Sequence, residues 1–84
     1  MERQILLLLL ANNLKIISEI EDIGSNLGEP DCKLINPYVV DGEDLSPWMA
    51  EYTNETELMI SSDKILTLVE PKEKLLEDYL KLTK

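Results

Sequence analysis

Four consecutive residues, Ser61-Ser62-Asp63-Lys64, include the side-chain types that hydrolytic enzymes use as nucleophile and base. Adjacent residues in a turn do not define a preorganised triad, because the nucleophile, the base and the group that orients the base must meet in a set geometry. The sequence also has no glycine-rich loop of the kind that cradles phosphate groups. We therefore expect a protein that is not an enzyme.

Metal binding has equally little support in the sequence. The segment Asp41-Gly42-Glu43-Asp44 is rich in carboxylates, but the remaining ligands of a calcium-binding loop are missing, so it predicts a plain turn. There is no histidine and Cys32 is the only cysteine, which excludes a Cys/His metal site and a disulfide within the chain. We expect no metal and no cofactor, and a lone thiol suits a protein of the reducing cytoplasm.

The acidic residues are concentrated in the middle of the chain. Residues 16–63 hold twelve acidic residues and one basic residue, Lys33, whereas the segments on either side are close to neutral. A strongly acidic surface repels phosphate backbones and anionic lipid. This surface either only keeps the protein soluble or forms a patch that binds a basic protein partner. We expect no association with membranes.

The length of 84 residues indicates one domain, and a domain of this size is marginally stable by itself. Small domains are usually reinforced by disulfides, by a metal or by oligomerisation. Because the first two are excluded, the sequence favours a homo-oligomer.

The apolar segment ILLLLLANNLKIISEIEDIG, residues 5–24, decides the fold class. Its apolar run is too short to span a membrane, and it lacks the basic start and the cleavage site of a secretion signal. Apolar residues from Ile16 onward fall at helical spacing, so a helix is the rival interpretation. A run that is apolar on every side fits a strand covered on both faces, and Asn12-Asn13 fits a tight hairpin turn. We predict strands over residues 4–11 and 14–23.

The rest of the chain predicts further short strands. Pro37 lies in one of them and belongs at an edge or a bulge, because it cannot donate a ladder hydrogen bond. The predicted strands cover residues 31–40, residues 48–52 continued by 57–60, and residues 64–69, with turns over 41–44 and 61–63.

Residues 71–84 predict a short amphipathic helix. Pro71 suits a first helical position, and one apolar stripe follows at helical spacing, formed by Leu75, Leu76, Tyr79 and Leu80. A helix of this length does not persist alone, so it should pack on the strands or on a neighbouring subunit. We therefore predict a mainly β fold, a small five-stranded barrel over residues 1–70 with the helix over 71–84 in the same domain.

Two segments resemble the Sm-like (Lsm-type) proteins, above all those of the cyanophage type. LANNLKIISEIEDI, residues 10–23, is similar to the family's first conserved block, and ELMISSDKILTLVEP, residues 57–71, is similar to the second. The resemblance covers about residues 5–71 and implies a strongly bent five-stranded barrel. It also implies a homo-oligomeric ring of about five to seven subunits, in which the fourth strand of one subunit pairs with the fifth strand of the next. The interface residues would be Glu57, Leu58, Met59, Ile60, Ile65, Leu66 and Thr67.

Sm-like rings usually bind single-stranded, U-rich RNA near the pore, so the resemblance also implies a base-binding pocket. The family places a stacking group, an asparagine and an Arg-Gly pair there, and the corresponding positions in this chain hold Glu29, Asp31 and Ser61-Ser62. None of these matches, and Asp63-Lys64 beside them supplies a single cation. Acids around a pore would repel a phosphate chain.

Two functions follow from these observations. The first is an RNA-associated scaffold ring, and the alternative is an adapter ring that binds a basic protein partner through its acidic surface. Tyr38, Trp48 and Tyr52 could stack on bases, although aromatic residues on alternating strand positions more commonly belong to a core or an interface. Either ring would act in the cytoplasm, or in the host cytoplasm if the protein is viral.

Overall fold

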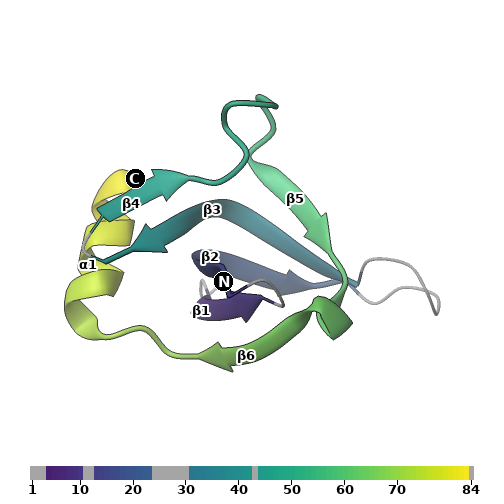
Figure 1. The fold of residues 1–84 in the computed structure, drawn as a ribbon, viewed down its shortest axis with the longest axis horizontal. Helices are drawn as coiled ribbons and strands as arrows, with labels where there is room; N and C mark the ends of the chain where they lie inside the picture. The colour runs from purple at the N-terminus through teal and green to yellow at the C-terminus, as the bar shows by residue number, and fades with distance from the viewer. Residues whose placement is uncertain (1–3, 11–12, 24–30, 43, 84) are drawn as a thin grey trace.

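The computed structural model describes residues 4–10, 13–23, 31–42 and 44–83. Within these ranges the chain is mainly β, with a short 3-10 turn and one α-helix near the C-terminus (Figure 1). The elements are β1 Ile5–Leu10, β2 Lys15–Asp22, β3 Cys32–Asp41, β4 Asp44–Pro47, β5 Glu57–Ile60, η1 Ser62–Lys64, β6 Ile65–Val69 and α1 Glu73–Leu82.

All six described strands belong to one antiparallel sheet in the order β4-β3-β2-β1-β6. Strand β5 joins the same sheet through β3, so two short strands share one long neighbour. The first part of β3, Cys32–Ile35, pairs with β5, and its last part, Tyr38–Asp41, pairs with β4. Figure 1 shows the resulting strongly curved sheet, with α1 at the same end as β4.

The structure corrects the prediction of a five-stranded barrel. The described part of the chain forms six strands in an open sheet, because β6 pairs with β1 and β5 pairs with β3, but no ladder joins β5 to β6 there. The predicted strand over residues 48–52 is a turn in which Tyr52 and Thr53 donate backbone hydrogen bonds to Met49, at 3.0 and 3.1 Å. Pro47 ends β4 because proline has no ladder donor, and Met49 then takes a positive φ of 68°.

The opening segment is the predicted pair of strands and not a helix. Asn13 has a φ of 64°, and Leu10 and Asn13 close the hairpin through backbone hydrogen bonds of 2.9 Å to Leu14 and Leu10. The predicted turn residue Asn12 lies outside the described residues. The predicted turn over 41–44 is shorter than expected, since β3 continues to Asp41 and β4 begins at Asp44.

Bending of β3 organises the fold. Between Ile17 and Glu19 the register with β3 shifts, so that Ser18 lies opposite the two residues Asn36 and Pro37. This is a β-bulge, and Asn36 has the left-handed φ of 53° that such an insertion often requires. Ser18 is fully buried and donates a hydrogen bond of 3.1 Å to the carbonyl of Ile35, which holds the bend in place.

The hydrophobic core lies inside the curve of the sheet. Leu8, Leu10, Ile16 and Leu34 form its buried centre, with 0 to 7% of each residue exposed. The partly buried residues packed around this centre are Leu14, Ile20, Trp48, Ile60 and Ile65. Alternation along β2 places Ile17, also fully buried, on the opposite face of the strand from Ile16.

Helix α1 packs on the outside of the bend through Tyr79, which is fully buried. The Tyr79 hydroxyl accepts a hydrogen bond from the backbone N–H of Glu19 at 3.1 Å, and the carbonyls of Ile35 and Asn36 lie at 3.0 and 2.9 Å as acceptors for its proton. The Tyr79 and Tyr38 rings form a T-shaped pair with a centroid distance of 5.8 Å. The predicted apolar stripe is therefore the packing face of the helix, although the helix begins at Glu73 and not at Pro71. Across the described residues, no helix has the length and apolar character needed to cross a membrane.

Candidate interaction surfaces

The residues predicted to line an RNA pocket gather at one end of the β3–β5 pair. Cys32 is paired with Ile60, so Asp31 and Ser61 flank this pair at the same end of the two strands. Ser62, Asp63 and Lys64 follow as η1, in which Lys64 donates a backbone hydrogen bond of 3.0 Å to Ser61. Asp63 and Lys64 are exposed, whereas Asp31 and Ser61 are half-buried. Glu29 lies outside the described residues.

Partial burial and acidic neighbours together lower the reactivity of Cys32 at this end of the sheet. Partial burial raises the pKa of the Cys32 thiol above its ordinary value, and the nearby carboxylates of Asp31 and Asp22 raise it further. A thiol with a raised pKa is mostly protonated at neutral pH and is therefore a poor nucleophile.

Alkylation of Cys32 by iodoacetamide should therefore be slow in the folded protein. We expect the rate to rise with pH and to reach its midpoint above 9.0, the ordinary thiol value, because only the thiolate reacts. The control is the same chain unfolded in urea, whose midpoint should be close to that value. A midpoint at or below 9.0 in the folded protein would contradict the electrostatic assignment.

Lys33 forms a bridge across three strands. Its ammonium group lies 3.2 Å from the Glu57 carboxylate on β5 and 3.6 Å from the Glu21 carboxylate on β2. A hydrogen bond to Glu57, followed by the charges of Glu21 and Glu57, raises the pKa of Lys33. The single basic residue of the acidic segment is thus already matched by two carboxylates, so little of its charge is left to hold a phosphate chain.

The predicted oligomer interface falls on two strands that each have one paired side. Residues 57–60 form β5, whose only partner among the described strands is β3, and residues 65–67 begin β6, whose only such partner is β1. Leu66 on β6 is 59% exposed and Met59 on β5 is 51% exposed. Apolar side chains on an unpaired sheet edge favour pairing with another chain.

The prediction missed the second half of this edge. Leu68 is 49% exposed and Val69 is 45% exposed, so the apolar edge extends over most of β6. Beside it lies a mainly apolar groove of about 200 Å³, lined by Ile20, Cys32, Ile65, Leu66, Thr67 and Leu68. The sequence carries a signal for this extension, since apolar residues continue to Val69, whereas the resemblance implies an interface only up to Thr67.

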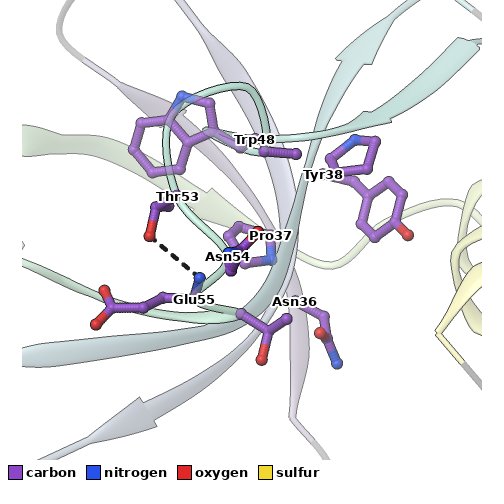
Figure 2. Close-up of a pocket in the computed structure, with 10 residues that line it drawn as sticks. Asn36, Pro37, Tyr38, Trp48, Thr53, Asn54 and Glu55 are labelled. Carbon is purple, nitrogen blue, oxygen red and sulfur yellow. Dashed lines mark hydrogen bonds between the residues drawn. The ribbon is translucent and has the colours of Figure 1, made fainter.

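A pocket of about 310 Å³, which we call the corner pocket, lies between the bulge of β3 and the loop that joins β4 to β5. Asn36, Pro37, Trp48, Asn54, Glu55 and Thr56 are among the residues that line it. Figure 2 shows the Trp48 ring and the Glu55 carboxylate extending to the same side of this loop, while the Tyr38 ring points away from them. Tyr52, which was expected to alternate with Trp48 along a strand, is 80% exposed.

Comparison with known proteins assigns a family and no function. Residues 3–84 match a family of unknown function, DUF6561. The chain belongs to this family. No curated protein matches the sequence. Because DUF6561 is defined without an activity, the function of this member has to be argued from its surfaces.

Proposed function

We propose that this DUF6561 protein is a non-enzymatic scaffold that assembles into an Sm-like ring of about five to seven copies. The observation that carries this proposal is the apolar edge of β6, where Leu66, Leu68 and Val69 are each about half exposed. The resemblance to Sm-like proteins assigns β5 and β6 to the contacts between neighbouring subunits. A head-to-tail contact of this kind closes into a ring when the rotation between subunits is suitable.

Pairing of β5 with β6 of the next copy would remove two liabilities at once. The free ladder groups of both strands would gain hydrogen-bond partners, and the leucines of β6 would leave water. Burial of apolar area contributes about 25 cal/mol per Å², so a contact that covers these side chains supplies the stabilisation that a small domain needs.

Within such a ring, the charge favours an adapter for a basic protein. No basic residue occurs between Lys33 and Lys64, whereas seven acidic residues do. Lys33 is itself matched by Glu21 and Glu57. A surface of one sign steers a partner of the opposite sign and repels nucleic acid, so the preferred partner is a basic polypeptide.

An RNA-associated scaffold is the second candidate, and one observation favours it. Asp31 and the Ser61–Lys64 segment lie at the same end of the β3–β5 pair. The resemblance assigns base binding to these positions, and a ring would repeat them around its pore. The side chains differ from those of the family, so binding would need an unconventional pocket.

Native mass spectrometry of the purified protein, with and without a short oligo-U RNA, separates these functions. We expect a ring mass that is unchanged by RNA, and the same ring should bind a polylysine chain at low salt. A ring that gains one RNA would establish the second candidate instead. A monomer at micromolar concentration would contradict the ring itself.

A further inference from the structure

The corner pocket is a built feature of the fold, because its loop is pinned at both ends to the bulge of β3. Trp48 donates a backbone hydrogen bond of 2.9 Å to the carbonyl of Pro37, and Asn36 donates one of 2.7 Å to the carbonyl of Thr56. The backbone N–H of Glu55 bonds to the Thr53 hydroxyl oxygen at 3.1 Å, as the dashed line in Figure 2 shows. These bonds fasten both ends of the loop over residues 48–56 to β3.

The size of the corner pocket limits what it can receive. Its volume of about 310 Å³ is at the low end of the range for ligand sites, about 300–1,000 Å³. A pocket of this size accommodates one large side chain of a partner more readily than an extended ligand.

The lining of the corner pocket has the side chains that suit a planar cation such as a guanidinium group. Trp48 provides an aromatic ring, and Glu55, which is exposed at the rim, provides a carboxylate. The lining contains no basic residue that would compete for that carboxylate. A guanidinium group can lie against an indole ring and at the same time donate two hydrogen bonds to a carboxylate, whereas an ammonium group is a compact, strongly hydrated charge.

We propose that the corner pocket binds an arginine side chain of the basic partner protein, with the guanidinium group between Trp48 and Glu55. The inference rests on the proposed adapter function and adds the residue type that the adapter recognises. Asn54 and Thr56 add polar groups to the lining, and Pro37 adds an apolar group against which the methylene stem can pack.

Trp48 is the only tryptophan, so its fluorescence reports directly on the corner pocket. The experiment titrates the full chain with a Gly-Gly-Arg-Gly-Gly peptide blocked at both ends, and with matched peptides that carry lysine or citrulline in place of arginine. We expect a saturable change in fluorescence with the arginine peptide. The lysine and citrulline peptides should bind at least about fivefold more weakly, because lysine lacks the planar guanidinium and citrulline keeps its shape without the charge.

Two variants on the same loop make the test specific. Glu55→Gln should weaken binding of the arginine peptide by about fivefold to tenfold, because it removes the charged acceptor. The matched control is Glu51→Gln, which removes the same charge from an exposed residue outside the pocket lining and should leave binding within about twofold.

Three results would overturn the inference. They are the absence of a saturable fluorescence change with the arginine peptide, an equal loss of affinity in Glu55→Gln and Glu51→Gln, and a fluorescence response to oligo-U but not to the arginine peptide. Polylysine binding, measured in parallel, separates failure of this inference from failure of the adapter function. If polylysine binds and the arginine peptide does not, the acidic adapter stands and the corner pocket is not its recognition site. If polylysine does not bind either, the adapter function has failed as well.

Discussion

Replacing Tyr79 with alanine should lower the free energy of unfolding by about 3–5 kcal/mol, the usual cost of removing a buried aromatic side chain. Tyr79 is fully buried in the native state, and its ring contacts Tyr38. A domain of 84 residues has about 4–13 kcal/mol of stability in total, so this variant should lose a large share of it. Urea denaturation followed by Trp48 fluorescence and circular dichroism measures the change.

The more conservative Tyr79→Phe separates the hydroxyl from the ring. We expect a loss of about 1–3 kcal/mol, because the Glu19 N–H and the carbonyls of Ile35 and Asn36 lose a buried partner. The matched control is Tyr52→Phe, since Tyr52 is 80% exposed and should change stability by less than about 0.5 kcal/mol. Equal effects of the two substitutions would show that the hydroxyl does not anchor the helix.

Leu66→Lys should convert the proposed ring into monomers. Leu66 is 59% exposed in the single chain, so the variant should fold, but pairing β6 with a neighbour would then bury an unmatched ammonium group. Lysine on an exposed strand is also a common natural means of preventing edge-to-edge association. We expect the dissociation constant between subunits to rise by at least about tenfold, measured by native mass spectrometry and by light scattering over a dilution series.

The control for this substitution is Leu82→Lys on α1. Leu82 is 51% exposed, which is close to the value for Leu66, but it lies on the helix and not on the sheet edge. This variant should keep the oligomeric state of the unmodified protein. If both variants dissociate, the added charge acts through net charge or stability, and β6 is not the interface.

The sequence carried enough information for the elements whose signals are local. The apolar run and the Asn12-Asn13 pair predict the β1–β2 hairpin, because a buried strand and a tight turn are both signalled by neighbouring residues. The spacing of Leu76 and Tyr79 predicts the packing face of α1 for the same reason. The acidic charge of the middle segment, which supports the proposed partner, also follows from composition alone.

The segment between β4 and β5 shows why local patterns were not sufficient. Trp48 and Tyr52 alternate as strand residues do, yet the backbone turns there, because Pro47 ends the ladder and both ends of the loop bond to the bulge of β3. The corner pocket exists only through this contact between distant parts of the chain. A pattern confined to one strand or one turn does not connect Trp48 and Glu55 with Asn36, because the loop meets the bulge only when the chain folds back on itself.

What the sequence determined by itself is the mainly β class, the first hairpin, the amphipathic helix and the acidic surface. The tertiary structure alone decided that the sheet is open, that β6 exposes an apolar edge, and that Tyr79 holds the helix to the bend. The physical reason is separation along the chain: the Tyr79 hydroxyl bonds to groups 43 to 60 residues away. Periodicity records which face of an element is apolar, but only the assembled fold determines what that face contacts.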